Sequence, residues 1–162
     1  MKSELLQKFS SIKLFLFDLE GVLIPKSFVE NSENEEELFQ KLSKGWEQFR
    51  NNGARFGIVT SRNDMLVSKI KMHEDCIVLS ASLNKVKMVD ELLAEKKVDY
   101  ENVFYIGDDL LDIPLLQKSG LSSVPKDGRR EVKRVVTFVS KSNSGEVLQE
   151  IIDYFKESKK MN

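Results

Sequence analysis

The sequence has few of the features that stabilise a secreted domain or carry a chain into a membrane. It contains one cysteine, Cys76, so no disulfide can form within the chain, and the apolar run around Cys76 indicates a buried thiol. No apolar run is long enough to span a bilayer, and the N-terminal segment MKSELLQKFSS contains acidic and polar residues that a signal peptide lacks. We therefore predict a cytoplasmic protein without a membrane partner.

The sequence also lacks an excess of charge of either sign. Its 25 lysine and arginine residues are balanced by 26 aspartate and glutamate residues, which gives a formal net charge of -1. Because nucleic acids bind strongly basic surfaces, we expect no nucleic-acid partner. A chain of 162 residues with 41% hydrophobic residues is ordinary for one globular unit, so residues 1–162 are predicted to form a single domain.

Short apolar runs alternate along the chain with segments of helical period. Buried strands are predicted at 14–17, 56–59, 76–79 and 103–106, and two shorter strands at 120–124 and 136–139. Helices are predicted between these strands, and a last amphipathic helix is predicted at 145–156. Because strands that alternate with helices favour a parallel sheet covered on both faces, the predicted fold class is α/β. We expect a Rossmann-like, three-layer α/β/α arrangement with a mainly parallel sheet.

The stretch between the first two strands is harder to assign. Residues 24–44 are polar and acidic, and we predict a minimal cap insert that leaves the sheet and turns at 31–34. After the second strand, Asn63 is predicted to cap the next helix. His73, the one histidine, follows that helix beside two acidic residues, where a surface position is expected rather than a catalytic one.

Three of the predicted strands end in chemically capable side chains. They are Asp18 and Glu20 after the first strand, Thr60, Ser61 and Arg62 after the second, and Asp108, Asp109 and Asp112 after the fourth. In an open parallel sheet the carboxyl ends of the strands meet at one edge, where ligands bind. Asp18 and Asp108 could supply hard oxygen ligands to Mg²⁺, and Lys85, at the start of a helix, could add a positive charge to the same site.

These motifs occur in an order that resembles a known family. The strings DLEGVL at 18–23, TSR at 60–62 and GDDLLD at 107–112, with the helix-start Lys85, resemble the haloacid dehalogenase superfamily of aspartate-nucleophile phosphotransferases. The segments KVKMVDELL and YIGDDLLDIPLLQKSGLSSVPKDG are similar to its small-cap phosphatases for 3-deoxy-octulosonate 8-phosphate and nine-carbon sugar acid phosphates. The resemblance implies a Mg²⁺-dependent phosphomonoesterase that acts through an aspartyl-phosphate on a small phosphorylated metabolite, a sugar acid phosphate.

The resemblance also implies roles for the acidic residues. Asp18 would attack phosphorus, and Glu20 would protonate the leaving alkoxide and later deprotonate the hydrolytic water. The metal ion would be held by Asp18, the backbone carbonyl of Glu20 and Asp108. Asp109 and Asp112 would orient these ligands or the waters on the metal.

The remaining roles concern the phosphoryl group and the assembly. Thr60 and the Ser61 amide would donate hydrogen bonds to the phosphoryl oxygens, and Lys85 would stabilise those oxygens electrostatically. Arg62 is either a substrate contact or a salt-bridged arginine. Because relatives with so small a cap complete their sites by assembling, the resemblance implies a homo-oligomer, with a tetramer favoured.

Two features of the sequence depart from the sugar acid phosphatases. Glu20 stands where most members have aspartate, although a phosphoserine phosphatase branch carries the similar string DLEGVL. The tail SNSGEVLQE, residues 142–150, lacks their glycine-rich, arginine-containing pattern. These departures leave open a weakly active or non-catalytic assembly or regulatory module, related to the phosphatase-like domain of sialic acid activating enzymes. A phosphoaspartate receiver is disfavoured by the GDDLLD motif and the order of the acids.

Overall fold

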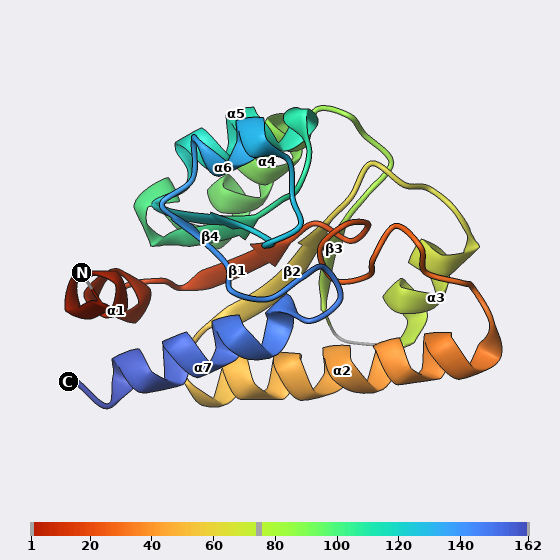
Figure 1. Cartoon of the computed structure of the whole chain (residues 1–162), viewed down its shortest axis with the longest axis horizontal. Coiled ribbons are helices and arrows are strands. Elements are labelled where there is room, and N and C mark those ends of the chain that lie inside the picture. The colour runs from red at the N-terminus through yellow and green to blue at the C-terminus, as the bar shows by residue number, and fades with distance from the viewer. Residues whose placement is uncertain (1, 74–75, 162) are drawn as a thin grey trace.

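A computed structural model describes residues 2–73 and 76–161 of the chain. The expectation for His73 and its acidic neighbours concerns side chains that lie outside this described part. At the centre is a six-stranded sheet in the order β3-β2-β1-β4-β5-β6, and every strand pair in it is parallel (Figure 1). The strands are β1 (Leu14–Phe17), β2 (Arg55–Val59), β3 (Ile77–Leu79), β4 (Val103–Ile106), β5 (Leu121–Val124) and β6 (Phe138–Val139). The predicted α/β fold with a parallel sheet is confirmed.

Helices cover both faces of the sheet. One layer contains α1 (Lys2–Ser10), α2 (Ser32–Asn51), α3 (Met65–His73) and α7 (Val147–Lys159), and the other contains α4 (Lys85–Lys96), α5 (Ile113–Lys118) and α6 (Arg130–Lys133). Figure 1 shows α2 and α7 side by side beneath the strands, with α4, α5 and α6 above them. Two short 3₁₀ turns, η1 (Tyr100–Asn102) and η2 (Leu110–Asp112), flank β4. None of the described helices is long and apolar enough to cross a membrane.

The central strand β1 is buried on both faces, which explains its uninterrupted apolar sequence. Phe15 and Phe17 point into the core between the sheet and the layer of α2 and α7. Leu14 and Leu16 point into the core between the sheet and the layer of α4 and α5. The ring of Phe15 stacks on that of Phe49 from α2, with their centroids 4.4 Å apart. Each such side chain contributes roughly 1.5–3 kcal/mol by burial, so the end of β1 is firmly held.

Two predictions about helix starts are wrong. The predicted turn at 31–34 is instead the beginning of α2, because Oδ1 of Asn31 accepts a hydrogen bond from the Asn34 amide at 2.8 Å and caps the helix. Thus 25–31 of the predicted insert form a loop, and the residues after it join α2 and pack on the sheet through Leu38. At α3 the cap is Asp64 rather than Asn63, since Oδ1 of Asp64 accepts from the Val67 amide at 3.2 Å.

Candidate active site

The acidic residues of the first and last motifs meet at the carboxyl ends of β1 and β4. These strands are parallel neighbours in which Phe17 lies opposite Ile106, so the residues that follow them are brought together. Carboxylate oxygens of Asp18, Asp108 and Asp112 all lie within 4.8 Å of one another, and all three residues are buried. The structure therefore gathers three of the predicted site residues into one compact cluster.

Lys85 reaches this cluster from the first position of α4. Oδ1 of Asn84 accepts from the Lys87 amide and caps the helix, which fixes the direction in which Lys85 leaves it. The ammonium nitrogen Nζ of Lys85 lies 2.7 Å from Oδ1 of Asp112 and 3.1 Å from Oδ1 of Asp18. Lys85 thus bridges the predicted nucleophile and the last acid of the GDDLLD motif.

Asp112 is occupied by donors on both of its carboxylate oxygens. Oδ1 accepts from Lys85 and from the hydroxyl of Tyr105 at 2.6 Å, while Oδ2 accepts from the backbone amides of Asp108 and Asp109 at 3.0 and 3.2 Å. Gly107 permits this arrangement, because a Cβ there would lie 2.5 Å from Cγ of Asp112. Asp112 therefore shapes the turn that carries Asp108, rather than facing a substrate.

The cluster contains more buried negative charge than buried positive charge. Burial raises the pKa of Asp18 well above its ordinary value, and the nearby charge of Asp112 raises it further while Lys85 opposes both. Burial and Asp112 likewise raise the pKa of Asp108, against the opposing charge of Lys26. Burial alone would lower the pKa of Lys85, but the carboxylates of Asp18 and Asp112 outweigh it, so this pKa is raised and the ammonium stays charged. A divalent cation with oxygen ligands fits the remaining negative charge.

The predicted phosphate-binding residues lie at the end of β2. Thr60 is buried, and its Oγ1 accepts a hydrogen bond from the Arg62 amide at 3.1 Å. Ser61 is exposed beside it. Asp109 lies outside the buried cluster, where its Oδ1 accepts from the Leu110 amide and pairs with Arg129 at 3.1 Å. Of the two residues expected to orient metal ligands, the structure therefore places only Asp112 inside the cluster.

Arg62 pairs with three carboxylates at the rim of the site. Its guanidinium lies 3.4 Å from Oε2 of Glu20, 3.1 Å from Oε1 of Glu30 and 2.7 Å from Oδ2 of Asp64. The side chain of Glu20 is 54% exposed, whereas that of Arg62 is 19% exposed. Arg62 therefore connects the predicted general acid to the loop before α2 and to the start of α3. These contacts correspond to the salt-bridged arginine, the second of the two roles considered for Arg62 from the sequence.

Sequence reasoning did not find Tyr105 or Lys26. Tyr105 is fully buried within the apolar strand β4. The sequence signal for it was its hydroxyl, the one polar side-chain group in that strand. Lys26 lies in the loop after β1, with Nζ 3.6 Å from Oδ2 of Asp108. The position of Lys26 depends on the conformation of a loop whose sequence has no helical or strand period, so nothing in the sequence indicated that Lys26 approaches Asp108.

Replacing Tyr105 by phenylalanine should destabilise the cluster without dismantling it. The hydroxyl donates to the buried Asp112 and accepts from Lys85 at 3.3 Å, so its loss leaves a buried carboxylate with one donor fewer. We expect a fall of about 1.5–3 kcal/mol in the free energy of unfolding, measured by urea denaturation. Tyr154→Phe, which removes a partly exposed hydroxyl from α7, is the control and should change the stability far less. Equal stability of Tyr105→Phe and the wild type would contradict this network.

Known proteins resemble the chain in sequence. The family model for haloacid dehalogenase-like hydrolases matches residues 68–152. The 3-deoxy-D-manno-octulosonate 8-phosphate phosphatase of Escherichia coli is 29% identical over 136 residues, which cover 78% of this chain and 69% of that protein. The matched part of this chain includes Lys85 and the GDDLLD motif.

Solved structures resemble the chain in fold. The crystal structure of 3-deoxy-D-manno-octulosonate 8-phosphate phosphatase from Yersinia pestis has a TM-score of 0.85 at 21% identity, and the likeness covers 97% of this chain and 87% of that one. The enzyme of that name from Moraxella catarrhalis, solved with a magnesium ion, a phosphate ion and a KDO molecule, has a TM-score of 0.78 at 21% identity. That likeness covers 98% of this chain and 96% of the other. These likenesses establish the fold.

Proposed function

The chain belongs to the haloacid dehalogenase-like hydrolase family, and from this premise we propose that it is a magnesium-dependent phosphomonoesterase that works through an aspartyl-phosphate at Asp18. The match confirms the resemblance drawn from the sequence, and the phosphatases among the relatives agree with the prediction of an enzyme of this kind. The observation that carries the proposal is the position of Asp18. It lies 3.1 Å from the ammonium of Lys85 and within the buried cluster of Asp108 and Asp112.

The acid cluster fits a magnesium ion, the ion found with phosphate in the Moraxella catarrhalis relative. Asp18, Asp108 and the backbone carbonyl of Glu20 would hold it, and Asp112 would keep the turn of Asp108 in place. When bound, such an ion supplies positive charge that lets an anionic phosphate ester approach a carboxylate. Asp109 would act only from the rim, through its pair with Arg129.

The protein's own residues carry the two displacement steps. A carboxylate oxygen of Asp18 attacks phosphorus, the ester P–O bond breaks, and Glu20 gives its proton to the leaving alkoxide. Glu20 then takes a proton from water, whose oxygen attacks the phosphorus of the aspartyl-phosphate. The bond between phosphorus and the Asp18 oxygen breaks, which restores the carboxylate and releases inorganic phosphate. Lys85 opposes the effect of burial on the pKa of Asp18 and, with Thr60 and the Ser61 amide, stabilises the charge on the phosphoryl oxygens.

The substrate we propose is a sugar acid phosphate, such as 3-deoxy-octulosonate 8-phosphate or a nine-carbon analogue. The names of the relatives support this class, because both the Escherichia coli and the Yersinia pestis proteins are phosphatases for 3-deoxy-D-manno-octulosonate 8-phosphate. The cytoplasmic location, the single domain with an insert at 24–44 and the homo-oligomer, with a tetramer favoured, stay predictions.

A second candidate is a weakly active or non-catalytic assembly or regulatory module. The observation that favours it is the pairing of Glu20 with Arg62, at 3.4 Å, in a position where the resemblance implies aspartate in most members of the family. Phosphate release from sugar-acid, sugar and amino-acid phosphates, with Mg²⁺ and with chelator, decides between the two. Metal-dependent release that is lost in Asp18→Asn supports the enzyme, while release no greater than that of Asp18→Asn on every ester supports the module.

Glu20 and Arg62 should behave as one unit in this reaction. Glutamate is one methylene longer than aspartate, and its carboxylate is held by the guanidinium of Arg62. We expect Arg62→Met to lower kcat by about tenfold through misplacement of the acid. In a Glu20→Asp background, where the shorter side chain no longer reaches Arg62, the same change should have no further effect.

The comparison of Arg62→Met in the wild-type and Glu20→Asp backgrounds distinguishes a positioning role of Arg62 from a substrate-binding role. If Arg62 binds substrate instead, KM rises by the same factor in both backgrounds, which would contradict the positioning role. Arg55→Met, which removes an exposed arginine at the start of β2, is the matched control and should leave both constants unchanged.

A further inference from the structure

A pocket opens directly beside the acid cluster. It has a volume of about 310 Å³ and lies between the loop after β1 and the turn that follows β5. Its walls include Gly21, Lys26, Ser27, Asp108, Arg129 and Ser144. Asp108 belongs both to this pocket and to the buried cluster that contains Asp18, so the pocket adjoins the cluster.

Two partly exposed cationic side chains line this pocket. Nζ of Lys26 lies 3.6 Å from Oδ2 of Asp108, and the side chain of Lys26 is 62% exposed whereas that of Asp108 is 8% exposed. Lys26 therefore reaches inward from solvent toward an oxygen of the cluster. Arg129, 49% exposed, pairs with Asp109 at 3.1 Å and with Glu131 at 3.5 Å. Both cations come from loops, so neither is needed to hold the sheet together.

The acids that face the pocket are accounted for by other partners. Oδ1 and Oδ2 of Asp127 accept hydrogen bonds from the amide and the hydroxyl of Ser144, each at 2.8 Å. These bonds lower the pKa of Asp127 against the opposing effect of its burial, and they fix Ser144 at the pocket wall. Asp108 is a ligand of the metal in the proposed function. A divalent cation held by Asp108 would weaken the attraction between this carboxylate and Lys26.

We propose that Lys26 and Arg129 bind a second anionic group of the substrate, the carboxylate of a sugar acid phosphate, at the end of its carbon chain opposite the phosphoryl group. This inference rests on the proposed function and assigns residues to its substrate class. In the proposed function Lys85 and Thr60 serve the phosphoryl oxygens, which leaves Lys26 and Arg129 for another anionic group. A carboxylate matches them in sign, and it can accept hydrogen bonds from an ammonium and a guanidinium at once.

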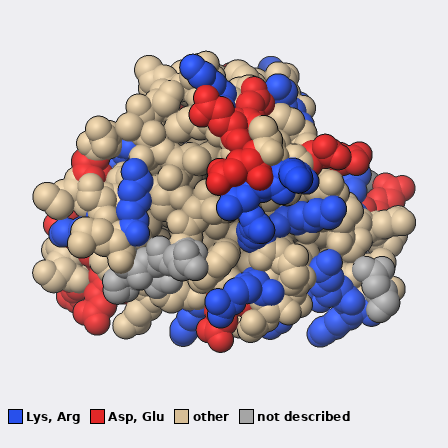
Figure 2. Space-filling view, turned by 180° about the vertical axis from the view of Figure 1, so that it is seen from behind, with Lys and Arg blue, Asp and Glu red and all other residues tan. Residues whose placement is uncertain are grey.

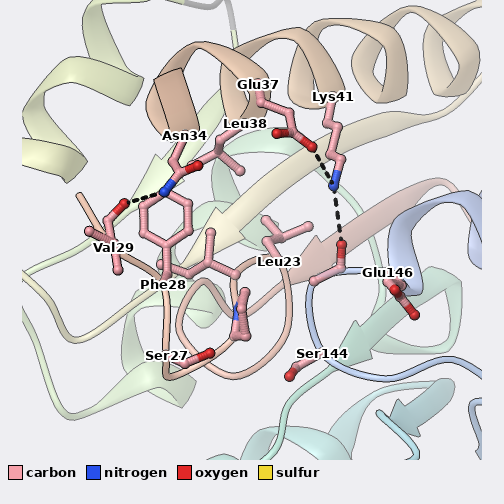
Figure 3. Close-up of a pocket in the computed structure, with 13 residues that line it drawn as sticks. Leu23, Ser27, Phe28, Val29, Asn34, Glu37, Leu38, Lys41, Ser144 and Glu146 are labelled. Atoms are coloured by element: carbon pink, nitrogen blue, oxygen red, sulfur yellow. Dashed lines mark hydrogen bonds and ion pairs between the residues drawn. The ribbon is translucent and has the colours of Figure 1, made fainter. Parts of the chain in front are cut away.

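The neighbouring pocket gives room to the carbon chain that separates the two anionic groups of such a substrate. It has a volume of about 370 Å³ and shares Pro25, Ser27 and Ser144 with the pocket beside Asp108. Figure 3 shows Ser27 and Ser144 at one end of it, and Asn34, Glu37 and Lys41 at the other. The hydroxyls at the junction and the polar groups beyond it suit the hydroxylated carbon chain of a sugar acid.

Calorimetry with a pair of phosphonate analogues tests the inference without turnover. One analogue carries a carboxylate, and the other is the matching sugar phosphonate in which a neutral group replaces the carboxylate (the neutral analogue). The binding of both to the full chain is measured with Mg²⁺. We expect tighter binding of the acid analogue, and a loss of about tenfold in its affinity in Lys26→Met and in Arg129→Met, as for one charge-assisted hydrogen bond. Binding of the neutral analogue should be unchanged in both variants.

Lys126→Met is the matched control, since Lys126 is an exposed lysine in the same turn that does not line the pocket. An equal loss for both analogues in Lys26→Met would overturn the inference, because it would make Lys26 a phosphoryl contact. Stronger Mg²⁺ binding in Lys26→Met without a change in the preference for the acid analogue would also overturn it. Lys26 would then only neutralise Asp108 while no metal is bound. If the wild type hydrolyses esters but binds the two analogues equally, only this inference fails. If it binds neither analogue and hydrolyses nothing, the proposed function fails with it.

Discussion

Replacing Lys85 by methionine should both inactivate and destabilise the protein. We expect kcat for phosphate release to fall by about 10²–10³, the usual effect of removing one donor that stabilises charge in a transition state. The free energy of unfolding should fall by about 3–5 kcal/mol, because the change leaves buried carboxylates without their cation. Stopped assays of phosphate release and urea denaturation in chelator measure the two effects.

The physical reason is the burial of Lys85 among acids. Its side chain is 6% exposed, and Nζ lies 2.7 Å from Asp112 and 3.1 Å from Asp18, whose side chains are 1% and 10% exposed. Without the ammonium the pKa of Asp18, already raised by burial, rises further. A protonated carboxyl needs no cation. The stability lost in Lys85→Met should therefore shrink as the pH falls, since the acid then enters the folded state neutral.

Lys87→Met is the control, because Lys87 is exposed two positions along the same helix and should tolerate the change. Should Lys85→Met fail to fold, the double variant Lys85→Met/Asp112→Asn restores part of the charge balance, and its recovery of stability tests the same pairing. A Lys85→Met protein as stable and as active as Lys87→Met would show that the buried cluster is not organised as described.

Replacing Gly21 by alanine should be the most damaging change in the loop after β1. Gly21 has a φ of +85°, where a Cβ costs roughly 1–2 kcal/mol, and the new atom would overlap Oδ2 of Asp108. Overpacking adds about 1–3 kcal/mol, so we expect a total loss of about 2–5 kcal/mol in the free energy of unfolding. Displacing Asp108 by about 1 Å should also lower kcat roughly 10²-fold. Urea denaturation and phosphate release again provide the measurements.

Gly53 offers a matched control for this substitution. Its φ is +83°, nearly the same as that of Gly21, but a Cβ there would meet nothing within 4 Å. Gly53→Ala therefore carries the backbone strain alone, and the difference between the two variants isolates the displacement of Asp108. Equal losses of stability in the two variants, with activity kept in both, would mean that the close approach of Gly21 to Asp108 has no consequence.

The sequence predicted the centre of the site because its residues follow strands. Apolar runs such as 14–17 and 103–106 are reliable strand signals, and in a parallel sheet they bring Asp18 and Asp108 together whatever the loops do. Lys85 was also found, because it begins a helix with a clear buried side. The resemblance to a family added roles to these positions, and the family match agrees with it.

The sequence could not predict contacts that depend on loops or on side-chain direction. The polar and acidic residues before Leu38 hid the start of α2, because propensity gave no sign that Asn31 would cap a helix rather than form a turn. The three carboxylates around Arg62 come from separate segments, and only the folded loop brings Glu30 to it. Charge placement on the surface was equally hidden. Figure 2 shows small groups of acidic and basic side chains side by side on one face, which an even count of charges does not predict.

The most direct test of the account is covalent labelling of Asp18 during turnover. Wild-type protein would be quenched while it hydrolyses a sugar acid phosphate in Mg²⁺, then treated with borohydride, which reduces an aspartyl-phosphate to homoserine. We predict homoserine at position 18 in the peptide that contains DLEGVL, and none in chelator or in Asp18→Asn. Metal-dependent phosphate release with an unmodified Asp18, continuing in the Asp18→Asn variant, would contradict the proposed nucleophile.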